Sequence, residues 1–172
     1  MMNNLYELVC PCHFGLEAVL KREIYDLGYD ISKVDNGRVY FEGDDEAIAR
    51  ANVNLRTAER VMICVGEFQA VTFTELFDQV AELEWERFIP KDGKFWVTKA
   101  SSVNSKLFSG SDIQSIVKKA IVSRLSKKYN ISWFEETGNE YPIKIMILKD
   151  KVSVCIDTTG VALHKRGYRI AS

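Results

Sequence analysis

The chain has 172 residues, of which 47% are apolar and 27% charged, a composition typical of a globular protein with one large or two small cores. No apolar run reaches the roughly 18–20 residues that a membrane-spanning helix requires, and the N-terminus lacks the basic and apolar regions of a signal peptide. The four cysteines do not follow the spacing of a disulfide framework. We therefore expect a cytoplasmic protein with free thiols and no membrane partner.

The net charge of −1 conceals a contrast between the two halves of the sequence. Residues 1–90 carry 17 acidic and eight basic side chains, a net charge of −9, whereas residues 91–172 carry seven acidic and 15 basic side chains, a net charge of +8. Such asymmetry indicates a polyanionic partner for the basic half. Lysines that merely decorate a solvated face are the alternative explanation.

The first part of the chain has the strand and helix order of a ferredoxin-like domain, β-α-β-β-α-β. Gly28 follows an apolar stripe of helical spacing, Asn36-Gly37 favours a two-residue hairpin turn, and Asp44 or Asp45 can cap the second helix. The predicted elements are a strand over 5–9, a helix over 15–27, strands over 31–34 and 38–42, a helix from about 44 to 58 and a strand over 61–68.

A second unit follows without a flexible linker, so the whole chain is predicted to be α+β. Thr72 with Glu75, and Ser111 with Gln114, have the spacing of helix-opening capping boxes. The predicted elements are a helix over 72–83, a strand over 95–100, a polar loop over 101–110, a helix over 112–129, a connector over 130–141, a hairpin of strands 143–148 and 152–157 around Lys149-Asp150-Lys151, and a last strand or extended tail over 161–169.

The helix over 112–129 carries five basic residues and one acidic residue, Asp112. A solvated helix usually alternates the signs of its charges, so bases without acidic neighbours indicate a missing anionic partner, which phosphates would supply. Attraction to the negative end of the helix dipole is the alternative, although it accounts only for the last turns. The five bases are Lys118, Lys119, Arg124, Lys127 and Lys128.

Two further segments combine bases with hydrogen-bonding or aromatic side chains. The run Leu163-His164-Lys165-Arg166-Gly167-Tyr168-Arg169 offers cations for phosphate and a tyrosine for stacking on an unpaired base, but an edge strand protected by bases fits it equally. The loop from Lys99 to Lys106 could hydrogen-bond an RNA backbone, or could simply be solvated.

Motifs of catalysis and metal binding do not occur in the sequence. It has no G-x-G-x-x-G, no G-x-x-x-x-G-K-[ST] and no G-x-S-x-G. The potential ligands in Cys10-Pro11-Cys12-His13 lie too close together for an ordinary zinc site, and no second ligand pair follows at the usual spacing. We therefore predict no catalytic residue and no metal site in this chain.

Seven segments, in order, resemble the N-terminal region of bacterial THUMP-containing RNA methyltransferases, some of which carry the description N6-adenine-specific DNA methylase. The final run is the most specific part, and Thr159-Gly160 departs from the expected Ser-Gly. The segments are Gly15-Leu16-Glu17, Asn54-Leu55-Arg56-Thr57-Ala58-Glu59-Arg60-Val61, Ser105-Lys106-Leu107, Gln114, Lys118-Lys119-Ala120-Ile121-Val122, Asp157-Thr158-Thr159-Gly160 and Leu163-His164-Lys165-Arg166-Gly167-Tyr168-Arg169.

The resemblance implies a ferredoxin-like domain over 1–68, a THUMP domain that captures structured RNA over 69–172, and a class I catalytic domain absent from this chain. That domain would use S-adenosylmethionine to methylate the exocyclic amine of a guanine in large-subunit ribosomal RNA. The alternatives are an adaptor for tRNA thiolation or acetylation that acts without its own catalytic domain, and a structural module that does not bind RNA. The expected RNA-binding residues are Lys99, Lys106, Lys118, Lys119, Arg124, Lys127, Lys128, His164, Lys165, Arg166, Tyr168 and Arg169.

Overall fold

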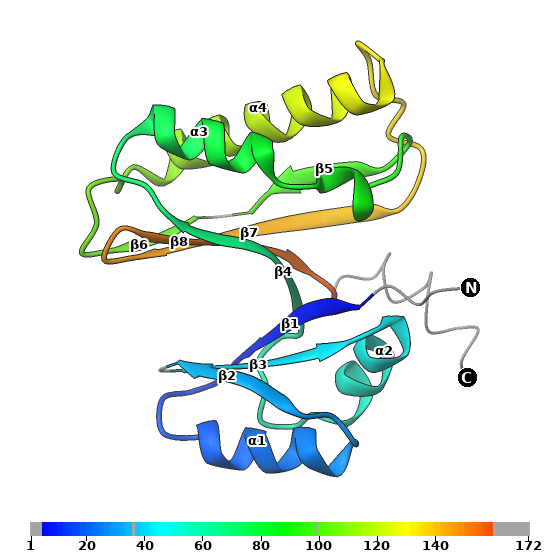
Figure 1. The fold of residues 1–172 in the computed structure, drawn as a ribbon, viewed down its shortest axis with the longest axis vertical. Coiled ribbons are helices and arrows are strands. Elements are labelled where there is room, and N and C mark those ends of the chain that lie inside the picture. The colour runs from blue at the N-terminus through cyan, green and yellow to red at the C-terminus, as the bar shows by residue number, and fades with distance from the viewer. Residues whose placement is uncertain (1–4, 36, 99, 160–172) are drawn as a thin grey trace. The chain divides into compact units, whose positions relative to one another are not determined.

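The computed structural model of the protein describes residues 5–35, 37–98 and 100–159. These residues form two compact units (Figure 1). Unit 1 consists of two segments of the chain, the one up to Cys64 and the one from Asp157 onward. Unit 2 is the segment between them, Val65–Ile156. The boundary expected from the sequence, between residues 68 and 69, lies four residues after the change of unit, and residues 157–159 belong to unit 1 rather than to the second domain.

Unit 1 has the predicted β-α-β-β-α-β order, and its antiparallel strands follow one another as β2-β3-β1-β4. Asp44 caps α2 by accepting the Ala47 N–H, and Gly28 takes a φ of +97° after α1, so both predicted helix signals are confirmed. The elements are β1 (Tyr6–Pro11), α1 (Glu17–Asp26), β2 (Ile31–Asp35), β3 (Arg38–Gly43), α2 (Asp45–Asn54) and β4 (Met62–Gln69), the last of which continues into unit 2.

The returning chain completes unit 1 through hydrogen bonds to the segment that precedes β4. Asp157, whose side chain is 10% exposed, forms an ion pair with Arg60. Thr158 donates both its N–H and its hydroxyl to the Val61 carbonyl, and its hydroxyl also accepts from Asn52. Residues 157–159 therefore hold the end of α2 and the start of β4 in place.

Unit 2 packs two helices against a mixed sheet in the order β4-β8-β7-β5, with β6 beside β7. Strands β5 and β6 run parallel to β7, and β8 forms an antiparallel hairpin with it. The elements are α3 (Phe73–Glu82), the short 3-10 helix η1 (Trp85–Arg87), β5 (Lys94–Val97), β6 (Ser101–Val103), α4 (Gly110–Tyr129), β7 (Glu140–Leu148) and β8 (Lys151–Asp157). The predicted α+β class is confirmed.

Three local expectations for unit 2 have definite outcomes. The Thr72–Glu75 capping box is confirmed. The second box is wrong, because α4 begins after Ser109 and the Gln114 side chain donates to two carbonyls at the end of β5. The polar loop is wrong over 101–103, where a serine-rich segment pairs with β7 although it has no apolar alternation of its own. The tail over 161–169 lies outside the described residues.

One face of α4 lies in the core of unit 2. Its buried side chains are Ile113, Val117, Ala120, Ile121 and Leu125, as the helical spacing predicts. The helix contacts α3, β5 and η1. In β7, buried and partly exposed residues alternate. Near the end of the helix, Trp85 is fully buried and donates its ring N–H to the Val80 carbonyl at 2.8 Å. These contacts fix the rotation of α4 about its own axis.

The C-terminal half of α4 is anchored to η1 by a two-pronged ion pair. Arg124 donates to both carboxylate oxygens of Glu86, at 3.0 and 2.9 Å, and the two side chains are only 20% and 25% exposed. The Tyr129 hydroxyl donates to the Ile89 carbonyl at 2.7 Å, and burial raises the pKa of this phenol. Hydrogen bonds from Arg124 lower the pKa of Glu86, because they favour its charged form.

We expect Glu86→Gln to lower the free energy of unfolding at pH 7 by about 1–2 kcal/mol, since it removes a charge-assisted pair that solvent partly screens. Because the folded state lowers the pKa of Glu86, the pair stabilises the protein above the unfolded pKa near 4.5 and loses this effect as the pH falls through the folded pKa. Urea unfolding at several pH values measures this difference. All three tryptophans lie in unit 2, so their fluorescence reports on it. Glu82→Gln, at an exposed position of α3, is the control. A loss of unfolding free energy in Glu86→Gln that does not change with pH would contradict the prediction.

Candidate nucleic-acid interface

The six described candidate residues differ in how far solvent reaches them. Lys106, Lys119, Lys127 and Lys128 are exposed, whereas Lys118 and Arg124 are partly buried. The other candidates, Lys99, His164, Lys165, Arg166, Tyr168 and Arg169, lie outside the described residues. The exposed cations of unit 2 therefore form the candidate interface.

Lys118 covers an edge of the unit 2 core. Its amino group donates to the Phe95 carbonyl and lies 3.8 Å from the centre of the Phe95 ring. The Phe95 ring also meets Phe134 edge to face, with ring centres 6.1 Å apart. Burial lowers the pKa of Lys118, and the charge of Glu136 opposes this change. The Lys118 ammonium group therefore already has a hydrogen-bond acceptor and an aromatic contact within the protein, without an RNA phosphate.

Arg124 already has an anionic partner, and the inference that the five helix bases lack acidic partners is wrong for this residue. Its partner Glu86 comes from η1, 38 residues earlier in the chain, so the sequence of the helix alone gave no sign of it. The fork of the guanidinium is occupied by the carboxylate. Arg124 therefore orients α4.

Lys119, Lys127 and Lys128 are the cations of α4 that face solvent, and none has an ion-pair partner among the described residues. Three serines stand near Lys119 at helical spacing on the side opposite the buried stripe, at positions 115, 123 and 126. Lysine ammonium groups and serine hydroxyls both donate to phosphate oxygens. Lys127 and Lys128 lie in the last turn of the helix, and Lys128 is on the side of Glu86. We call Lys119 and these serines, together with Lys127 and Lys128 at the end of the helix, the α4 outer face.

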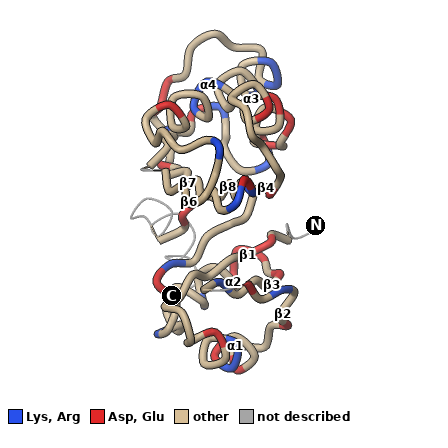
Figure 2. Tube along the Cα trace, turned by 90° about the vertical axis from the view of Figure 1, so that its left-hand side faces the viewer, with Lys and Arg blue, Asp and Glu red and all other residues tan. Residues whose placement is uncertain are grey.

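The charge contrast in unit 2 lies between its two helices. Residues 65–156 contain 13 basic and 12 acidic side chains, a net charge of +1, so the excess of bases in residues 91–172 does not extend to unit 2 as a whole. The division at residue 90 had assigned acidic α3 and basic α4 to different halves. Figure 2 shows acidic positions on α3 and basic positions on α4. The exposed acids of α3 and the turn after it are Glu75, Asp78, Glu82 and Glu84.

A second group of exposed cations lies where the segment after β6 meets the β7–β8 turn. The Asp150 carboxylate accepts the Lys106 N–H at 2.7 Å, and the Asp150 N–H donates to the Ser105 hydroxyl at 2.9 Å. Lys149 donates its N–H to the Val103 carbonyl and has an exposed side chain. Lys149 is a candidate that the sequence analysis treated only as part of a turn. Its proximity to Lys106 depends on contacts between residues more than 40 positions apart.

The described residues provide no group of three or more His, Cys, Asp or Glu side chains that could hold a metal ion. Cys10 and Cys12 are buried, and burial raises the pKa of Cys10 to about 12. The ring nitrogen Nε2 of His13 lies 3.4 Å from a carboxylate oxygen of Glu59. No described helix combines the length and the apolar character needed to cross a membrane.

Comparison with known proteins places both units in described families. Residues 7–62 match the RlmL ferredoxin-like domain, and residues 70–157 match the THUMP domain. The chain is 51% identical over 168 residues to "Putative RNA methyltransferase YpsC" of Bacillus subtilis (strain 168), and this match covers 96% of the chain and 43% of the relative. It is 28% identical over 162 residues to the tRNA (guanine(6)-N2)-methyltransferase of Methanocaldococcus jannaschii, covering 91% of the chain and 42% of that protein.

A solved structure shows the same arrangement of elements. The crystal structure of SMU.472 complexed with SAH superposes with a TM-score of 0.87 and 46% sequence identity, over 98% of this chain and 45% of that one. The chain thus spans less than half the length of each of these three proteins. The chain belongs to the THUMP domain family, and a ferredoxin-like domain of the RlmL kind precedes its THUMP domain.

Proposed function

We propose that this chain is the RNA-capturing and substrate-positioning region of an RNA methyltransferase, and that unit 2 holds structured RNA through its exposed cations. The observation that carries the proposal is the agreement between the THUMP match, over residues 70–157, and the unit that presents the α4 outer face. Phosphate contacts from such a face fix the position of an RNA without reading its sequence. This property suits a region that presents a substrate to chemistry performed elsewhere.

The chemistry would belong to a further domain, either covalently attached or separate. This chain has no glycine-rich phosphate-binding loop of the G-x-G-x-x-G kind. The SAH in the SMU.472 structure supports S-adenosylmethionine as the methyl donor of the whole protein. Because a base within a stack is inaccessible to such an enzyme, RNA held by unit 2 would have to present an unpaired or extruded guanine.

Large-subunit ribosomal RNA is the substrate we propose first, with methylation at the exocyclic amine of guanine in the cytoplasm. tRNA is the second candidate, and the name of the Methanocaldococcus jannaschii relative favours it. An adaptor for tRNA thiolation or acetylation would instead recruit RNA to a separate enzyme. A structural module that does not bind RNA would show no salt-sensitive affinity for either RNA.

We expect the triple substitution of Lys119, Lys127 and Lys128 by Glu to weaken RNA binding at least about tenfold at low salt, since phosphate contacts are lost and repulsion replaces them. The slope of log affinity against log salt should decrease in magnitude by about 0.7–0.9 for each lost phosphate contact. Fluorescence anisotropy with a ribosomal RNA hairpin and a tRNA, titrated with salt, measures both effects. Preference for the hairpin supports the ribosomal substrate, and preference for the tRNA supports the second candidate.

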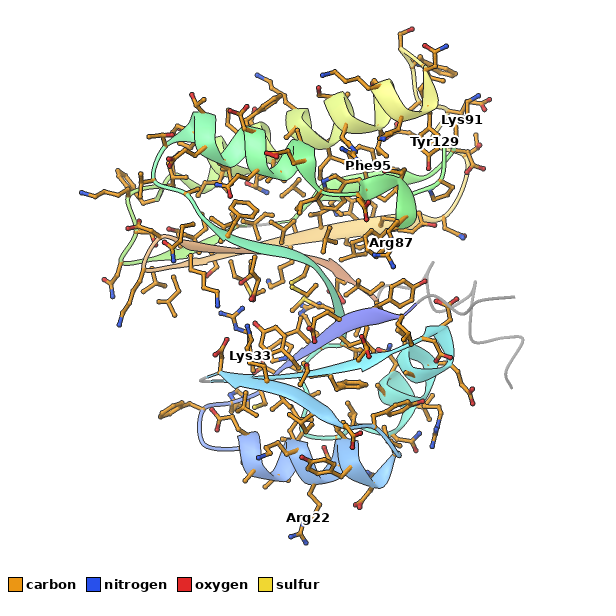
Figure 3. All side chains as sticks on the ribbon, in the orientation of Figure 1. Arg22, Lys33, Arg87, Lys91, Phe95 and Tyr129 are labelled. Atoms are coloured by element: carbon orange, nitrogen blue, oxygen red, sulfur yellow. The ribbon has the colours of Figure 1, made fainter. Side chains whose placement is uncertain are left out.

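Arg22→Glu is the control for replacing a base by an acid, because the exposed Arg22 side chain projects from α1, which belongs to unit 1 (Figure 3). This variant should keep the wild-type affinity and slope. A triple variant that also kept both would remove the α4 outer face from the binding surface.

Lys118→Met should leave the salt slope unchanged but lower the free energy of unfolding by about 0.5–1.5 kcal/mol. The substitution keeps an apolar stem over Phe95 while removing the carbonyl hydrogen bond and the ring contact of the ammonium. Urea unfolding and the same salt titration test the two parts. A decrease in slope with unchanged stability would show that Lys118 contacts phosphate.

A further inference from the structure

Three aromatic side chains among the described residues are more than two thirds exposed. They are Phe14 at 81%, Phe108 at 80% and Trp133 at 72%. A large exposed ring gives up the free energy of burial, which makes it a candidate contact for a partner. The charges around each ring indicate which partner would accept it.

Phe14 and Trp133 lie beside carboxylates. In unit 1, Phe14 stands next to Gly15, whose N–H donates to Glu17, and the Glu17 carboxylate also accepts the Gly37 N–H at 2.6 Å. Trp133 is followed closely by Glu135 and Glu136, both exposed. Such surroundings repel phosphate groups, so neither ring suits a nucleic acid.

Phe108 has a different environment. Residues 101–111 include no acidic side chain, and they place exposed Lys106 and several serines around the ring along the chain. Two carboxylates stand near this segment. That of Asp150 accepts the Lys106 N–H, and that of exposed Asp112 lies in the first turn of α4, where the positive end of the helix dipole offsets its charge. Phe108 also leads directly into α4, which begins at Gly110.

The backbone on both sides of Phe108 is fixed by contacts of its neighbours. Leu107 is 4% exposed, and its carbonyl accepts the Ser102 hydroxyl at 2.5 Å. On the other side, the Ser109 carbonyl accepts the Ile113 N–H at 2.9 Å. With the backbone fixed on both sides, only the side-chain torsions of Phe108 lose freedom when a flat partner stacks on the ring.

We propose that Phe108 is a stacking platform for one unpaired nucleobase of the RNA that unit 2 binds, and that Lys106 contacts the adjoining phosphate. The inference rests on the proposed function and deepens it, since it selects RNA with an unpaired nucleotide over continuous duplex. Every base has a π-face, so stacking on Phe108 tolerates different sequences. The ring adds affinity without adding charge.

The test compares two RNAs of equal length, a hairpin with a single-stranded 3′ overhang and a blunt, fully paired duplex, in salt-titrated anisotropy. Phe108→Ala should weaken binding to the overhang RNA about tenfold, as the loss of one base–aromatic stack predicts. It should leave the salt slope and the affinity for the duplex unchanged. Phe108→Trp should restore the affinity, because the larger ring also stacks.

Phe14→Ala is the matched control, because this ring is equally exposed but lies among carboxylates, and it should bind both RNAs like the wild type. Phe108→Ala with unchanged affinity for the overhang RNA, or with equal losses for both RNAs, would overturn the stacking proposal. If the triple α4 variant still weakened binding in that case, RNA capture by unit 2 would stand. Absence of salt-sensitive binding by the wild-type protein would instead overturn the proposed function and this inference together.

Discussion

The burial of one face of α4 determines what the rest of that helix can do. Five apolar side chains face the core, and the two-pronged pair between Arg124 and Glu86 holds the far half of the helix against η1. With the rotation of the helix fixed in this way, Lys119 faces solvent while Lys118 covers Phe95. Two adjacent lysines thus have different roles because a helix advances by about 100° per residue.

The sequence predicted the elements that depend on local pattern. The apolar stripe of α4, the Thr72–Glu75 capping box, the glycine after α1 and the β7–β8 hairpin were all expected from neighbouring residues, and each is present. The failures involve contacts between distant residues. The acid that pairs with Arg124 comes from η1, and the short strand β6 exists because β7 offers it an edge.

The division of charge along the sequence differs from its division between the folded units. The halves of the sequence differ strongly in charge, but unit 2 contains acidic α3 as well as basic α4 and is nearly neutral. The difference in charge that remains is the local one between α3 and α4, and a polyanion would experience it only within the distance of a few side chains. At that distance, cations would supply the salt-dependent part of RNA binding and Phe108 a part that salt does not affect. The two contributions can therefore be separated experimentally.

The hydrogen bonds of Thr158 to Val61 have a consequence for the order in which the protein forms. Because residues 157–159 complete unit 1, the sequence of unit 2 is inserted within that of unit 1. During synthesis, unit 1 cannot acquire these last bonds until the ribosome has produced all of unit 2. Unit 2 is contiguous in sequence, so it can fold as soon as β8 emerges. Unit 1 is thus the first to be synthesised and the last to complete its folding.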